Sequence, residues 1–303
     1  MLTTIVFPGQ GSQNLYLLRV LFNKYKVVRT LFRTAEKVLN IKLWDMITSD
    51  EKTLYLSEIS QPVILITGFA LFEIYLQKEN PLPDIMVGHS LGEYSALVAS
   101  RAITFDSAVK LVYLRGKLMQ SVSKKLDGKM NVVLNMTEES VHDICLKVVK
   151  EIGKVVEISS FNTSSQFVIS GESSAISHAS QYILEAGGLS KELKISVPSH
   201  CSLMKEISQE FERELEKIEI SQHNVRIIHN YNADFSDLCH IKSSLLKQLY
   251  MPVMWRQSIA KLLAFNHKKI IECNYNSILS NINKRIAKQL SYNIVAHNIL
   301  QYL

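Results

Sequence analysis

The chain has 303 residues, of which 47% are hydrophobic and 20% are charged. These values are typical of a soluble globular protein and exclude an intrinsically disordered chain. The formal net charge of +6 comes from dispersed basic residues, which argues against a nucleic-acid-binding protein and suits an acidic or phosphate-bearing partner. The length is sufficient for one large domain, alone or with a smaller insert.

The sequence gives little indication of a membrane span, a signal peptide or a metal site. The longest apolar stretch, Pro62 to Leu76, is interrupted by small and polar residues and is too short to span a bilayer, so we expect a core helix and no membrane contact. The first residues, MLTTIVF, lack the features of a signal peptide, and we expect a cytoplasmic protein. The four cysteines show no zinc-ligand spacing, and we expect reduced thiols and no metal.

The N-terminal segment predicts a strand followed by a glycine-rich turn. Thr3 to Phe7 has the composition of a strand, and Pro8 to Gln13 leads from it into a helix that passes Leu21. Gln10 lies between two glycines in this turn. The small neighbours would let the Gln10 side chain or a backbone amide approach a ligand, whereas a plain tight turn explains the glycines equally well.

The segment IMVGHSLGEYSALVAS, from Ile85 to Ser100, predicts a buried strand, a sharp turn at Ser90 and a helix. A glycine lies two residues to either side of the serine, where a side chain would crowd such a turn. The turn would force the Ser90 hydroxyl outward at a helix N-terminus, where the Leu91 amide could stabilise an oxyanion. The competing interpretation is a capped helix, since Ser90 and Glu93 have the S-x-x-E spacing of a capping box.

Arg115 lies on the apolar stripe of the next expected helix, at about Phe105 to Val122. An arginine is rarely buried without a partner. Either its aliphatic stem packs on the protein while the guanidinium reaches water, or the guanidinium is held inside for a substrate carboxylate, which it can bind with two parallel hydrogen bonds. Earlier helices are expected at Val27–Leu39 and from Ser60, with Pro62 in the first turn.

From about Gly128 the elements become shorter and follow the order β-α-β-β-α-β, which is the ferredoxin-like arrangement. They are expected at Met130–Leu134, Glu138–Lys150, Val155–Ile158, Gln166–Ser170, Ser174–Ala186 and Leu193–Val197, with a polar loop between the two middle strands. Together they make an inserted subdomain of roughly 70 residues, a usual size for a small domain. We place it at residues 126–196, between residues 1–125 and 197–303 of a larger α/β subdomain.

His200 follows the insert, just ahead of a helix expected at Leu203–Ile218. A lone histidine is usually structural, but a nucleophilic serine needs a base from elsewhere in the chain. The neighbouring Cys201 is a better candidate for a small buried residue than for a nucleophile. The rest of the chain returns to alternating strands and helices and offers no obvious Asp or Glu as a third member of a triad.

Five motifs in this order, FPGQGSQ, GHSLGEYSAL, RGKLMQ, NTSSQ and SVPSHCSLM, resemble malonyl-CoA:acyl-carrier-protein transacylases nearly from end to end. The resemblance implies an α/β-hydrolase-like large subdomain with an inserted ferredoxin-like small subdomain. It implies transfer of a malonyl group from malonyl-CoA to the phosphopantetheine thiol of an acyl carrier protein by a ping-pong reaction. The pathway would be fatty-acid synthesis or loading of a polyketide synthase. It implies no cofactor, and we expect a monomer.

The resemblance also implies roles for particular residues. Ser90 would carry the acyl group, and His200 would deprotonate it and later activate the incoming thiol. Arg115 would hold the malonyl carboxylate, while the main-chain carbonyl of Gln248 would orient the imidazole in place of an acid. The oxyanion hole and the walls of the site would come from Gln10, the Leu91 amide, Asn162 and Gln166.

Two loops depart from the family pattern. Leu15-Tyr16-Leu17 stands where Gly-Met-Gly is usual, and Asn274-Tyr275-Asn276 stands where a glycine-proline-glycine turn is usual. Asparagine tolerates left-handed backbone, so the second turn could be kept.

Two other functions remain open. A proofreading thioesterase would use the same Ser90 and His200 to let water take the acyl group, although a carboxylate clamp at Arg115 has no use there. A catalytically silent docking module is the second alternative, and the complete set of site residues argues against it.

Overall fold

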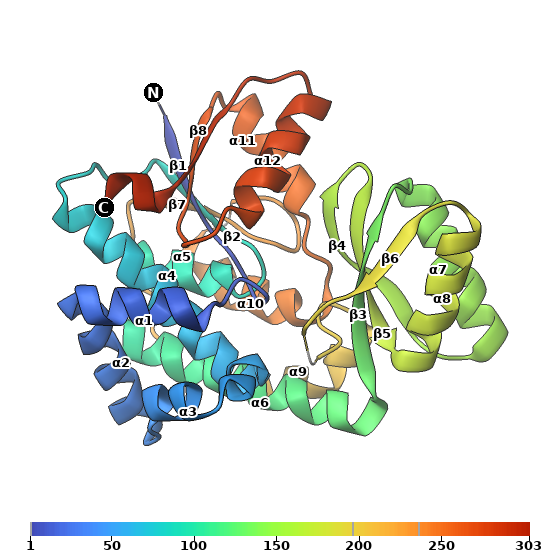
Figure 1. Ribbon diagram of the computed structural model, residues 1–303, viewed down its shortest axis with the longest axis horizontal. Coiled ribbons are helices and arrows are strands. Elements are labelled where there is room, and N and C mark those ends of the chain that lie inside the picture. The colour runs from blue at the N-terminus through green and yellow to red at the C-terminus, as the bar shows by residue number, and fades with distance from the viewer. Residues whose placement is uncertain (1, 196, 236) are drawn as a thin grey trace.

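The structure is a computed structural model and describes residues 2–195, 197–235 and 237–303. In these residues the chain forms a larger parallel sheet and a smaller antiparallel sheet, which lie side by side (Figure 1). The larger sheet has the order β7-β2-β1-β8-β9, with bounds Arg226–Ile228, Ile85–Gly88, Thr3–Phe7, Lys269–Glu272 and Val295–Asn298. The expected strand at Thr3 to Phe7 is confirmed.

Helices cover both faces of the parallel sheet because its strands are apolar on both sides. In β1, Ile5 and Phe7 pack into one core while Val6 packs into the other, as the alternation of side chains along a strand requires. The second core is formed with α11 (Trp255–Ala264) and α12 (Ile278–Gln289). The first core is formed with α1 (Leu15–Lys24), α2 (Lys26–Leu39), α3 (Leu43–Ser49), α4 (Ser57–Gln77), α5 (Gly92–Ala99), α6 (Phe105–Leu126), α9 (Ser208–Glu216) and α10 (Ile241–Tyr250).

The helix α4 is apolar on all sides and passes through the middle of this core. Among the described residues it is the helix whose length and composition would suit a membrane span, but 89% of its most apolar stretch is buried in the protein. The core helix expected here is therefore present. It begins at Ser57, so Pro62 lies in its second turn and not in the first, and the helix tolerates the loss of one backbone hydrogen bond.

The smaller sheet consists of β3 (Gly128–Leu134), β4 (Val156–Thr163), β5 (Gln166–Glu172) and β6 (Leu189–Glu192), in the antiparallel order β4-β5-β3-β6. The helices α7 (Glu138–Ile152) and α8 (Ser173–Glu185) pack on it around a separate core. This is the expected β-α-β-β-α-β order and ferredoxin-like arrangement. The division of the chain at residues 126 and 196 stays a prediction, and Ser196 lies outside the described residues.

Three expected element boundaries were wrong. The polar loop expected after Ile158 is part of β4, which continues to Thr163 because Phe161 packs against the insert core while Ser160 and Asn162 turn away from it. The last strand of the insert is β6, Leu189–Glu192, which ends before the expected strand Leu193–Val197 begins, and Leu193 and Ile195 line a cleft instead. The helix expected from Leu203 is divided into a 3-10 helix, Ser202–Ile207, and α9.

The strand β2 turns sharply into α5 at Ser90, which has a left-handed backbone with φ of 51°. The flanking glycines are required by contact: a Cβ on Gly88 would lie 1.9 Å from the Glu93 nitrogen, and one on Gly92 would lie 2.0 Å from the Phe7 oxygen. No side chain in the described chain caps α5, and the Glu93 amide binds the Ser90 carbonyl. The capping-box interpretation is therefore wrong, and the segment is an elbow.

Candidate active site

Ser90 and His200 meet at the elbow. The Ser90 Oγ lies 2.6 Å from the His200 Nε2. The His200 Nδ1 donates to the Gln248 carbonyl at 2.7 Å, and the His200 amide donates to the Leu249 carbonyl at 3.1 Å. Because a carbonyl can only accept, Nδ1 has the proton, and Nε2 presents a lone pair to the serine hydroxyl. The pair is therefore arranged for proton transfer from Ser90 to His200.

The carbonyls that hold His200 lie in the last turn of α10. Carbonyls at a helix C-terminus lack partners within the helix and have partial negative charge, so they can orient an imidazole and stabilise the imidazolium that forms when it accepts a proton. Burial first, and then the positive charge of Arg115, lower the pKa of His200 to about 3, although the hydrogen bond to the Gln248 carbonyl opposes both effects. The imidazole is therefore neutral and able to act as a base.

The guanidinium of Arg115 is fully buried and is bound only by neutral side chains within the described chain. Its Nη1 donates to Gln61 Oε1 at 2.9 Å and its Nη2 donates to Gln248 Oε1 at 3.3 Å, while Nε has no partner. Burial lowers the pKa of Arg115 because the charged form loses its hydration. The interpretation in which the guanidinium reaches water is thus wrong, and the buried cation has unused donors.

A cleft of about 550 Å³ opens in front of Ser90 and His200. Gln10, Asn162 and Gln166 line it, together with apolar residues of β3, β5 and α12. Leu91, Arg115 and Gln248 are not among its described lining residues and are at most 1% exposed, behind the elbow. The expected site residues therefore form two groups. One group lies on the cleft wall (Ser90, His200, Gln10, Asn162 and Gln166), and the other is buried beneath it (Leu91, Arg115 and Gln248).

The two polar residues from the insert are already hydrogen-bonded. The Asn162 Oδ1 lies 3.0 Å from His89 Nε2 and accepts from Ser160 Oγ at 2.8 Å, which braces the cleft wall against the elbow. The Gln166 Oε1 accepts from Arg285 on α12 at 3.3 Å. A backbone hydrogen bond also joins the insert to the larger subdomain, since the Phe161 amide in β4 donates to the Val253 carbonyl at 2.9 Å.

Donors for an oxyanion are available beside Ser90. Both protons of the Gln10 Nε2 are used, by Ser57 Oγ at 3.2 Å and Ser60 Oγ at 2.7 Å. The backbone amides of Gln10 and Leu91 donate to no residue that the structure describes. Backbone amides held in this way are effective oxyanion donors, so Gln10 is better suited to act through its amide than through its side chain.

Of the two departures from the family pattern, residues 15–17 form the first turn of α1 and not a loop, while the loop at residues 274–276 contacts the turn just before that helix. The Tyr275 hydroxyl accepts a hydrogen bond from the Asn14 amide, and the Asn276 Nδ2 donates to the Ser12 carbonyl at 3.0 Å. Neither Asn274 nor Asn276 is among the described residues with positive φ, so the expected left-handed turn is wrong. Side-chain hydrogen bonds fix this loop beside the Gln10 turn.

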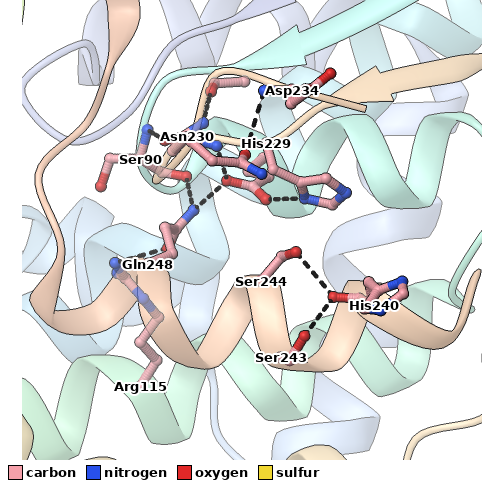
Figure 2. Close-up of polar contacts among 12 residues, drawn as sticks. Ser90, Arg115, His229, Asn230, Asp234, His240, Ser243, Ser244 and Gln248 are labelled. Carbon is pink, nitrogen blue, oxygen red and sulfur yellow. Dashed lines mark hydrogen bonds and ion pairs between the residues drawn. The ribbon is translucent and has the colours of Figure 1, made fainter. Parts of the chain in front are cut away.

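Sequence reasoning missed a group of polar residues beneath the elbow. Asn230 contacts the Ser90 amide (Figure 2). Glu93 contacts Asn230, His229 and the Gln248 side chain. One signal could have found Asn230. It lies two residues after the end of β7, the neighbour of β2, and the carboxyl ends of adjacent parallel strands meet at one edge of a sheet.

Comparison with known proteins agrees with this geometry. Residues 4–300 match the family model for the acyl transferase domain. The chain is 34% identical over 290 residues to the malonyl CoA-acyl carrier protein transacylase of Haemophilus influenzae, covering 94% of this chain and 92% of that protein. It is 35% identical over 289 residues to the protein of that name from Bacillus subtilis, covering 94% and 90%.

Solved structures give the same result over nearly the whole chain. The malonyl CoA-acyl carrier protein transacylase of Coxiella burnetii superimposes with a TM-score of 0.92 at 33% identity, covering 98% of this chain and 93% of that one. A malonyl-transacylase solved in complex with its type II polyketide-synthase acyl-carrier protein gives a TM-score of 0.91 at 33% identity, covering 98% and 95%. This chain therefore belongs to the malonyl-CoA:acyl-carrier-protein transacylases of the acyl transferase domain family.

Proposed function

We propose that this protein transfers the malonyl group of malonyl-CoA to the phosphopantetheine thiol of an acyl carrier protein, in fatty-acid or polyketide synthesis. The observation that carries the proposal is the environment of Arg115, behind the Ser90–His200 pair. A guanidinium has five N–H donors, and two of those of Arg115 are used by described residues. The Glu93 carboxylate acts on this cation only from a distance, so a substrate carboxylate would supply the direct ion pair and the acceptors that no described residue provides.

In the first half-reaction, the Ser90 Oγ attacks the thioester carbonyl as His200 Nε2 takes its proton. The developing oxyanion accepts hydrogen bonds from the amides of Leu91 and Gln10. The carbon–sulfur bond then breaks, and His200 returns the proton to the CoA sulfur. The product is a malonyl ester on Ser90.

In the second half-reaction, the thiol of the carrier protein gives its proton to His200 and attacks the ester. The ester carbon–oxygen bond breaks, the proton returns to Ser90 Oγ, and the malonyl thioester leaves on the carrier protein. Arg115 binds the malonyl carboxylate throughout, which distinguishes this reaction from hydrolysis of a simple acyl chain. A docking module would have no need of the 2.6 Å contact between Ser90 and His200.

We further propose that the reaction needs no cofactor beyond the CoA thioester and the phosphopantetheine arm of the carrier protein. A nucleophile, a base and hydrogen-bond donors are sufficient for acyl transfer. The enzyme would act as a monomer, because the cleft and the Ser90–His200 pair are built from one chain. The cytoplasmic location expected from the sequence stays part of this proposal.

Replacing Ser90 with alanine should abolish both covalent labelling by radiolabelled malonyl-CoA and transfer of the label to holo acyl carrier protein, since no other group is placed to carry the ester. Intact-mass analysis of the enzyme and counting of carrier protein and free malonate measure the two steps. A thioesterase would release label as malonate even when carrier protein is present. A malonyl group on Cys201, with turnover preserved in S90A, would refute the assignment.

The kcat/KM for malonyl-CoA should stay nearly constant from about pH 8 down to about pH 5. The base must be neutral, and His200, with its pKa lowered to about 3, keeps its neutral form throughout this range. An imidazole with the ordinary pKa of about 6.5 would instead lose most of its neutral form over the same range. Initial rates at each pH, with circular dichroism to verify folding, decide between the two. A fall centred near pH 6.5 would contradict the burial argument.

Replacing Arg115 with alanine should lower malonyl transfer by about 10²-fold or more, because charge-assisted hydrogen bonds contribute about 1.5–3 kcal/mol each. Acetyl transfer should be unchanged or faster, because acetyl-CoA has no carboxylate to bind. Lysine should restore only part of the preference, since it lacks the planar fork. The measurement is the malonyl-to-acetyl ratio of kcat/KM in the parent protein, R115A and R115K. A constant ratio would mean that Arg115 only supports the helix.

A further inference from the structure

Asn230 bridges the two sides of the Ser90 elbow with one side chain. Its Oδ1 accepts from the Ser90 amide at 2.6 Å, and its Nδ2 donates to the Gly88 carbonyl at 2.5 Å. Asn230 is 2% exposed, so both hydrogen bonds are shielded from water. These partners fix the orientation of the Asn230 carboxamide. The Ser90 N–H can only donate, so it must face Oδ1, and the Gly88 carbonyl can only accept, so it must face the NH₂ group.

The elbow needs this support because Ser90 is in a conformation that side chains disfavour. With φ of 51°, the Ser90 backbone lies in the left-handed region, where the Cβ crowds the following carbonyl. Such a conformation persists only where the surroundings determine it from several directions. The glycines leave room for the turn, and the Asn230 side chain binds the backbone groups on both sides of it.

Asn230 is itself fixed by the residues that position the base. The backbone amide of Asn230 donates to the Oε2 of Glu93 at 3.2 Å, and the same oxygen accepts from Gln248 Nε2 at 2.8 Å. Gln248 Nε2 also donates to the Ser90 carbonyl at 2.8 Å, and the Gln248 carbonyl holds His200. Figure 2 shows Asn230 and Gln248 on opposite sides of the Ser90 backbone.

We propose that Asn230 is a positioning residue for acyl transfer, which deepens the proposed function and rests on it. It fixes the direction of the Ser90 Oγ toward His200. By occupying the Ser90 amide, it leaves the adjacent Leu91 amide as the donor at the elbow for the oxyanion. Through Glu93, the nucleophile and the base share one buried support, so a loss at Asn230 disturbs their relative geometry and leaves the cleft and Arg115 in place.

The test compares N230A and N230D with the parent protein and with N232A. Asn232 lies in the same loop, is exposed, and binds only the nearby Asp234 amide among described residues, so it is a matched control. The rate at which Ser90 is modified is followed by intact mass with two reagents, malonyl-CoA and a fluorophosphonate that reacts with activated serines. Final stoichiometry gives the fraction of competent enzyme, and thermal unfolding verifies the fold.

We expect N230A to reach full stoichiometry with both reagents but about 10- to 100-fold more slowly per site, with KM for malonyl-CoA nearly unchanged, because small misplacements of reacting groups have effects of this size. N230D keeps an acceptor for the Ser90 amide but turns a second oxygen toward the Gly88 carbonyl, so its rate should lie between those of N230A and the parent. N232A should match the parent.

A parental rate per site in a folded N230A or N230D would overturn the inference, even if either variant were less stable. If N230A does not fold, N230D alone decides, since it should still be slower than the parent. A parent protein that reacts with the fluorophosphonate but not with malonyl-CoA would refute the proposed function and still test Asn230. A parent that reacts with neither would refute both.

Discussion

The left-handed backbone at Ser90 is the constraint on which the rest of the site depends. The chain must reverse there within one residue, because Gly88 packs directly against the first turn of α5 and leaves no space for a Cβ. The reversal directs the hydroxyl away from the sheet and toward His200, 2.6 Å away. It also places the Leu91 amide at the start of a helix, where a developing negative charge is favoured. Nucleophile and oxyanion donor are thus consequences of one turn.

The end of α10 takes the place of the acid in a catalytic triad. A carbonyl fixes the tautomer of His200 as a carboxylate would, but it adds no full negative charge, and the buried imidazole stays neutral. The Gln248 side chain extends this arrangement, because its two ends bind Arg115 and Glu93. Figure 2 shows Arg115 pointing from α6 toward Gln248. Gln248 therefore contacts all three groups: the base His200, the nucleophile Ser90 and the carboxylate-binding Arg115.

Features encoded by local spacing could be predicted from the sequence, and features made by distant contacts could not. The elbow, the order of elements in the insert and the pairing of Ser90 with His200 follow from short motifs and from the chemistry that a serine nucleophile requires. The support from Asn230 and Glu93 depends on β7 lying beside β2, a pairing of segments about 140 residues apart that no local pattern shows. The extent of β4 was missed because Ser160 and Asn162 are polar residues facing a cleft.

The most direct test of the account is a crystal structure of the protein trapped after reaction with malonyl-CoA. The account predicts an ester on Ser90 Oγ, with its carbonyl oxygen on the amides of Leu91 and Gln10 and the malonyl carboxylate on the guanidinium of Arg115. A malonyl group attached elsewhere would contradict it. So would an ester on Ser90 whose carboxylate faces solvent while Arg115 keeps only its contacts with Gln61 and Gln248.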